Sequence, residues 1–281
     1  MKKITLFAIA AFHISTAAFA QTNSSLNLKK GQKYLVENKI STTSSTEMQG
    51  QTMEAMADVA STYNIEVKDM VDNNYNLTNT VTAVKMTMSQ MGQEMKFDSE
   101  KKEDLDGPIG SALKEFIKQP KEVVIDKSGK VITKKSEEKT EADDINMIAK
   151  QLGDFEATGY GAVMAFESLP QDLKVGATWT SKTDEAGISK TTDYTVKAIN
   201  GDLATLSLSG TISTDMKIEQ QSMEITTKTT GKFSGEEIVD IKTGVIQSNT
   251  TTADASGIIG VMGQELPTSS KVTTTTIVKV M

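Results

Sequence analysis

The chain has 281 residues and a formal net charge of −7 at pH 7, because 37 acidic residues outnumber 30 basic residues, all of them Lys. It contains one His and no Cys. Most nucleophilic, general-base and transition-metal sites use those two residue types, so the composition argues against these classes of enzyme and metalloprotein and indicates no metal or cofactor. An acidic chain without Arg is also unsuited to phosphate or nucleic-acid recognition.

Residues 1–20 have the pattern of a cleaved export signal. Lys2 and Lys3 precede an apolar run at 4–12, and a small-residue cleavage site ends at Ala20. No segment reaches the roughly twenty apolar residues of a transmembrane helix. Cleavage would remove the only His and leave 28 Lys against 37 acidic residues, a net charge of −9. We therefore expect a periplasmic or extracellular protein without a transmembrane segment, stabilised by a core rather than by disulfides.

The first half of the mature chain predicts antiparallel strands. Apolar residues alternate cleanly over 59–71, which indicates a half-buried strand, and Asp72-Asn73-Asn74 predicts the turn into a return strand over 75–89. The alternation changes phase near Ala83, which indicates a β-bulge. A turn at 91–92 then leads to a short strand through 95–97.

A helical insert interrupts these strands. Asp106 is the expected N-cap, Pro108 lies in the first turn, and apolar residues at helical spacing over 109–117 predict about three turns of amphipathic helix. A hairpin over 123–132 follows, with Gly129 at its positive-φ position. The charged run 137–144 reads as a solvated segment before a second helix at 145–152.

The second half repeats short patterns of the first. Residues 173–179 resemble 28–34, the stretch 194–201 resembles 63–74, and 239–246 resembles the hairpin at Gly129, in the same order. Further strands are expected at 203–208, 212–218, 223–233, 245–252 and 271–280. We predict a mainly β protein of two related antiparallel curved sheets or half-barrels with a few packing helices. Its expected segments are a signal peptide (1–20), a first β repeat with the helical insert (21–150), a helical or loop connector (151–170) and a shorter second repeat (171–281).

The order of these elements resembles a family of exported proteins of unknown function that is common in Bacteroidota. A Lys-x-Gly-x-x-aromatic strand ends at Tyr34, an Asp-x-x-Gly hairpin begins at Asp126, and Leu169-Pro170 precedes a Val-Gly-x-x-Trp strand ending at Trp179. The resemblance covers nearly the whole mature chain, but its motifs are structural and imply no catalytic residues. At the level of fold alone, the element order is also similar to the open half-barrels of periplasmic lipoprotein carriers.

Methionine is the most unusual residue of the mature chain. The hairpin folded at 72–74 should bring two groups of Met to one end of the sheet. Three interpretations are open: Met that fills irregular core gaps, an adaptable apolar pocket for a lipid or a partner helix, and a Cu(I) site. For the pocket, the candidate ligand-binding residues are Met56, Met86, Met88, Met91, Met95, Leu113 and Phe116.

Carboxylates are the main acid–base groups left, and no pair of them stands out in the sequence. The apolar, Gly-rich stretch 257–263 is expected as a loop that contacts a partner or tucks under the sheet. We expect an exported, non-enzymatic protein that binds a lipid-like ligand or an envelope protein. The alternatives are a carboxylate-dependent hydrolase, with two carboxylates about 5–10 Å apart, and a purely structural envelope or matrix protein.

Overall fold

The computed structural model describes residues 25–114, 116–132, 164–185, 187–220, 223–261 and 263–281. The signal peptide expected at 1–20, the charged run at 137–144 and the helix expected at 145–152 lie outside the described residues. The elements are β1 (Lys33–Met48), β2 (Gln51–Val71), β3 (Asn74–Gln90), β4 (Gln93–Asp98), α1 (Lys102–Leu105), α2 (Pro108–Leu113), β5 (Pro120–Asp126), β6 (Thr178–Glu185), β7 (Ile188–Asn200), β8 (Leu203–Gln220), β9 (Met223–Asp240), β10 (Ile246–Val261) and β11 (Gln264–Val280).

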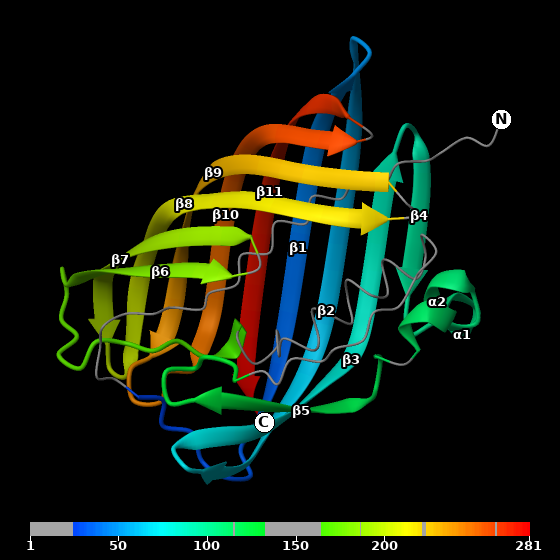
Figure 1. The fold of residues 1–281 in the computed structure, drawn as a ribbon. Coiled ribbons are helices and arrows are strands. Elements are labelled where there is room, and N and C mark those ends of the chain that lie inside the picture. Colours follow the sequence, from blue (N-terminus) through cyan, green and yellow to red (C-terminus); the bar gives the residue numbers. More distant parts are fainter. Residues whose placement is uncertain (1–24, 115, 133–163, 186, 221–222, 262) are drawn as a thin grey trace.

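The strands form one curved antiparallel sheet in the order β4-β3-β2-β1-β11-β10-β9-β8-β7-β6, with β5 paired to the first part of β3 (Figure 1). The mainly β, antiparallel prediction is confirmed. Strands from both expected repeats join the same sheet, because β11 returns beside β1 and pairs with it from Tyr34↔Val280 to Thr46↔Thr268. The sheet does not close into a barrel: among the described strands, β4 and β6 lie at its two ends and do not pair with each other.

Period-two alternation gives each strand one buried face, as the sequence predicts. We call the face with the buried residues the inner face and the opposite face the outer face. The bulge near Ala83 is confirmed, because the pairing of β2 with β3 shifts register between Thr62↔Ala83 and Tyr63↔Val81. The strands expected at 203–208 and 212–218 are one continuous strand, β8.

Two glycines allow the long strands to bend, as β8, β9 and β10 do in Figure 1. A Cβ atom on Gly210 would collide with the carbonyl oxygen of Thr191, and one on Gly257 would collide with that of Lys228. Glycine inside a strand marks such close backbone approaches and sharp bends. The stretch 257–263 is therefore not a loop over its length: Gly257 pairs with Thr268, and β10 continues to Val261.

The helical insert is shorter than the apolar spacing predicts. Helix α2 has six residues, and its N-cap is Gly107, whereas Asp106 is the C-cap of α1. The expected helix ends early because Ile117 forms a parallel bridge with Val81 of β3. Burying Ile117 against the sheet outweighs the small propensity gain from about one further helical turn.

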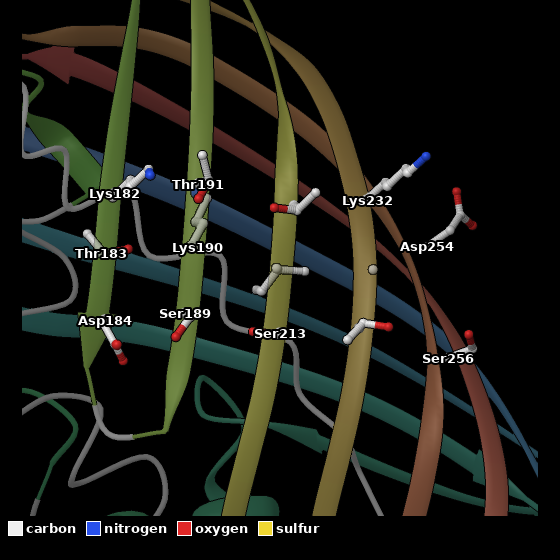
Figure 2. A pocket seen from close by; sticks show the side chains of 14 residues that line it. Lys182, Thr183, Asp184, Ser189, Lys190, Thr191, Ser213, Lys232, Asp254 and Ser256 are labelled. Carbon is white, nitrogen blue, oxygen red and sulfur yellow. The ribbon is translucent and has the colours of Figure 1, made fainter.

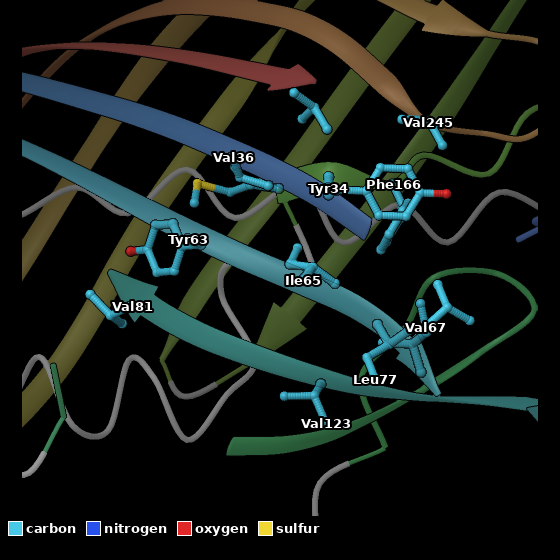
Figure 3. Packing of buried hydrophobic residues seen from close by; sticks show 14 of the residues in the cluster. Tyr34, Val36, Tyr63, Ile65, Val67, Leu77, Val81, Val123, Phe166 and Val245 are labelled. Atoms are coloured by element: carbon cyan, nitrogen blue, oxygen red, sulfur yellow. The ribbon is translucent and has the colours of Figure 1, made fainter. Parts of the chain in front are cut away.

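The main core lies on the inner face of β1–β3 and β5. Figure 3 shows its side chains converging there from three neighbouring strands, with Phe166 reaching in from the segment before β6. Tyr34 and Phe166 meet edge to face with ring centroids 5.4 Å apart. A smaller cluster around Tyr194 lies on the inner face of β7–β9. Each large side chain buried here contributes about 1.5–3 kcal/mol of transfer free energy.

The turns that precede β1 and β6 have the same hydrogen bonds. The amide of Gly31 donates to the carbonyl of Val67 (2.8 Å), and the amide of Gly176 donates to that of Val196 (2.9 Å). Both glycines have positive φ, 79° and 84°. The duplication that the sequence predicts, and the boundaries of its repeats, stay predictions.

Candidate functional site

The structure places three of the candidate Met residues together on the inner face. Met88 of β3 pairs with Met95 of β4, and the next inner-face pair along these strands is Met86↔Phe97. Met86 and Met88 are buried, and Met95 is half-buried. We call Met86, Met88, Met95 and Phe97 the Met-rich surface. The hairpin register also confirms that the two Met groups lie at one end of the sheet, since Met56 pairs with Ser89.

The other candidates divide into two groups. Leu113 of α2 is buried in the same core cluster as Met86, and Phe116 packs against that cluster. Met56 is 54% exposed and Met91 is 74% exposed. Met56 is adjacent in sequence to the buried Ala57, and successive residues of a strand point to opposite faces, so Met56 lies on the outer face. Met91 lies in the β3–β4 turn with φ 51°, outside the Met-rich surface.

A band of polar side chains crosses the inner face at one level of the sheet. Asn38, Thr276, Asn249 and Glu237 are cross-strand neighbours on β1, β11, β10 and β9. The Thr276 hydroxyl donates to Asn38 Oδ1 (3.1 Å), and Asn249 Nδ2 donates to Glu237 Oε2 (2.6 Å). All four are buried. Buried polar groups of this kind need partners, so these hydrogen bonds fix the orientation of the band.

Three buried ionisable side chains lie at the end of this band: Glu167, Lys190 and Glu237, which we call the charged cluster. Glu167 comes from the segment before β6, which is fixed where the Glu167 amide donates to the Gly244 carbonyl (2.8 Å). Glu167 and Glu237 are only 1% and 0% exposed. Lys190 of β7 is also buried, with its Nζ 4.7 Å from the centroid of the Phe233 ring.

Burial dominates the electrostatics of the charged cluster. Desolvation raises the pKa of Glu167 well above its usual value, and the nearby Glu237 charge raises it further. Desolvation also raises the pKa of Glu237 to about 7, against the lowering effects of Asn249 and Lys190. The pKa of Lys190 falls to about 8 because desolvation outweighs the attraction of both carboxylates. The site therefore disfavours charge: Glu237 and Lys190 titrate closer to neutral pH than exposed residues do, and the pKa of Glu167 is raised in the same sense as that of Glu237.

Three carboxylate oxygens of the charged cluster accept no hydrogen bond of normal geometry. They are Oε1 and Oε2 of Glu167 and Oε1 of Glu237. The Tyr194 hydroxyl approaches Glu167 closely enough to lower the pKa of that carboxyl, without reaching hydrogen-bond geometry. A buried acceptor without a partner costs about 1–3 kcal/mol, more if it is charged. These oxygens are thus suited to a donor that the chain itself does not provide.

The only Trp of the chain lies beside the charged cluster. Trp179 of β6 stacks on Tyr194, with ring centroids 4.8 Å apart and an interplanar angle of 2°. Trp179 is half-buried and packs against the core cluster of β7–β9. Its fluorescence therefore reports on the surroundings of Tyr194.

A trough of about 940 Å³ lies across β6–β10 (Figure 2). Lys182, Thr191, Thr211 and Lys232, which are cross-strand neighbours on the outer face, line part of it. Asp184 and Asp254 add two negative charges to the same lining. With both signs of charge and many hydroxyl groups, the trough indicates no particular ligand. It is open, and its lining also includes Lys190 of the charged cluster.

Within the described ranges, no group of three or more His, Cys, Asp or Glu side chains is arranged to hold a metal ion. Among those residues there is also no helix with the length and hydropathy needed to cross a bilayer.

Sequence reasoning missed the charged cluster, although strand alternation contains a signal for part of it. Glu237 has the same parity as Phe233 and Val239, which are buried on the inner face of β9. Lys190 has the same parity as Tyr194 on β7. A charged residue in register with buried apolar neighbours indicates a partner across the sheet. No comparable pattern identifies Glu167, because it lies outside the strands.

Residues 72–246 match the family described as "Family of unknown function (DUF6263)", and the chain belongs to this family. The matched range contains the Met-rich surface and the charged cluster. No curated protein matches the sequence.

One of the matching solved structures shares the fold at low sequence identity. A structure described as "Lipid-protein interactions in lipovitellin" matches with a TM-score of 0.50 at 11% identity, over 91% of this chain and 26% of that chain. The chain thus spans about a quarter of the lipovitellin chain. An outer membrane channel from Pseudomonas putida F1 matches with a TM-score of 0.28 at 9% identity, over 94% of this chain and 100% of that chain, which is too low to indicate a shared fold.

Proposed function

We propose that the protein is an exported, non-enzymatic binding protein that holds an apolar, lipid-like ligand on the inner face of its curved sheet. The pattern of residues 1–20 supports export, and the absence of Cys and Arg from the whole chain disfavours most catalytic chemistry. The Met-rich surface is the proposed site for the apolar part of the ligand, because unbranched thioether side chains adapt to varied apolar shapes.

The amphipathic inner face is the observation that carries this proposal. Val59 of β2 lies between Met86 of β3 and Ile40 of β1, so the Met-rich surface continues sideways to β1. Asn38, which begins the polar band, is the next inner-face residue of β1 after Ile40. Apolar walls with a few well-placed polar groups are typical of small-molecule sites.

The likeness to lipovitellin supports the same proposal at the level of fold. That match, with a TM-score of 0.50, covers most of this chain. The lipovitellin structure concerns lipid–protein interactions, and a curved, unclosed sheet offers a continuous inner face to an extended apolar molecule. The identity of the ligand does not follow from an 11% identical relative.

Native mass spectrometry of the protein purified from its host envelope tests the proposal. We expect a copurifying lipid on the unmodified protein and on Met56→Asp, because Met56 lies on the outer face. We expect its loss from Met88→Asp, which places a charge on the Met-rich surface. If Met88→Asp does not fold, Met95→Asp at the half-buried partner position replaces it. A protein that carries no lipid, or equal lipid on the inner-face and outer-face variants, would contradict the proposal.

The hydrolase alternative gains one observation from the structure, which is the pair Glu167 and Glu237 on the inner face. Both carboxylates are shielded from solvent, so a substrate, like any other ligand, reaches them only if the surrounding side chains move. A screen of esters and glycosides with the purified protein and Glu167→Gln decides between the two functions. Turnover that the variant abolishes would replace the binding proposal.

A further inference from the structure

The charged cluster has an excess of one negative charge when all its members are ionised. Glu167 and Glu237 together carry two negative charges, and Lys190 supplies one positive charge. Lys190 Nζ also lies over the Phe233 ring, which engages part of its charge in a cation–π contact. A buried charge without a partner is costly, so a site of this composition is stabilised by one more cation or by a proton on one of the carboxylates.

The orphan oxygens indicate which kind of cation fits. Oε1 and Oε2 of Glu167 and Oε1 of Glu237 are three buried acceptors without a hydrogen bond. A primary ammonium group carries one positive charge and three N–H donors. It therefore matches both the excess charge and the number of free acceptors. A hydroxyl group supplies one donor and no charge, and a carboxylate would add repulsion.

We propose that the ligand is a cationic amphiphile whose ammonium group lies between Glu167 and Glu237 while its apolar chain lies along the inner face. This inference rests on the proposed function and names the head group of the ligand. The polar band supports it, because Asn249 donates to Glu237 Oε2 and so leaves Oε1 for the ligand. A metal ion fits less well, since the described residues offer no third His, Cys or carboxylate ligand here.

The net charge of the whole chain also favours a cationic ligand. The whole chain carries a net charge of −7, so its field attracts cations toward the sheet before any specific contact forms. Exposed charges are screened within about 10 Å at 0.1 M salt, whereas the buried cluster is screened much less. Head-group selection that persists at high salt is therefore expected from the cluster rather than from the surface.

Fluorescence of the single Trp179 provides the test, because this ring stacks on Tyr194 beside the cluster. The delipidated protein is titrated at pH 7.5 with decylamine, decanol and decanoate below their micelle concentrations; the three probes share one chain length. We expect decylamine to bind about tenfold or more tightly than decanol, and decanoate to bind least tightly, since charge-assisted hydrogen bonds are the strongest of this set. The order should persist in 0.5 M NaCl.

Two variants test whether the preference for decylamine comes from the charged cluster. Glu167→Gln removes a charge with little change of shape and should reduce the preference for decylamine over decanol to about twofold or less, while binding of decanol is unchanged. Glu265→Gln, an exposed position on β11, should keep the full preference. If Glu167→Gln does not fold, Glu237→Gln takes its place.

The outcomes separate the two proposals. Equal binding of the three probes would overturn the ammonium proposal, as expected if a proton on Glu167 already balances the charge, and would leave the apolar site intact. If none of the three probes changes the Trp179 signal, the ammonium proposal is contradicted, and the mass spectrum decides on the apolar site. A preference for decylamine that survives in Glu167→Gln and Glu237→Gln would place the cation elsewhere and refute the inference.

Discussion

The stability of this protein should fall as the pH rises from about 5 to 8, and Glu237 is the residue whose effect is best defined. Burial raises its pKa from 4.5 to about 7 in the folded chain. Between these two values the folded state binds more protons than the unfolded state, so the free energy of unfolding decreases with increasing pH. A shift of this size corresponds to about 3 kcal/mol at 1.36 kcal/mol per pKa unit.

The other ionisable groups with shifted pKa values do not reverse this loss of stability between about pH 5 and 8. The pKa of Glu167 is also raised, so Glu167 adds to the loss of stability at higher pH. The pKa of Lys190 falls to about 8, and the resulting penalty is constant below that pH, where Lys190 is protonated in both states. The lowered pKa values of Glu66 and Asp98 act below the window, because the stability they add is complete above their unfolded-state values.

Urea denaturation at pH 5 and pH 8 measures the effect. The unmodified protein should lose about 3 kcal/mol or more between these pH values, and Glu237→Gln should remove most of the part that comes from Glu237. Glu265→Gln is the matched control at an exposed position and should show the same loss as the unmodified protein. A stability that is flat or rises from pH 5 to pH 8, or a Glu237→Gln protein with an unchanged loss, would refute this reasoning.

Three further substitutions probe the fold and the cluster. Leu26→Ala should lower the free energy of unfolding, measured by urea denaturation, by about 2–4 kcal/mol. The reason is that this buried side chain packs beside both hairpin glycines, Gly129 and Gly244. A loss below about 1 kcal/mol would contradict that packing. Gly210→Ala should cost about 1–3 kcal/mol by the same measurement, since the new Cβ meets neighbouring backbone, and a neutral effect would show that β8 does not need the close approach. Lys190→Met removes the cation beside two buried carboxylates, so its effect on stability in urea denaturation should be less favourable at pH 8, where the carboxylates lose protons, than at pH 5; equal effects would argue against ionised partners.

Local sequence patterns predicted most of the secondary structure. Alternation predicted β2 and β3, and the phase change at Ala83 predicted their bulge. Asn73 and Gly129 marked turns, and both have positive φ in the structure. These features depend on residues close together in sequence, where the two-residue period and turn chemistry act directly. The helix was overestimated because Ile117 satisfies helical spacing but packs on Val81 instead.

Features that depend on distant residues required the tertiary structure. The expected repeats form one sheet only because β11, the last described strand, pairs with β1, the first. Glu167, Lys190 and Glu237 come together because sheet curvature and the segment before β6 place them on one inner face, although each looks solvated in isolation. Turn residues and side-chain alternation depend on neighbours in the sequence, so they can be recognised from the sequence alone. Burial of a charge depends on what other strands place around it, and this is decided only when the sheet has formed.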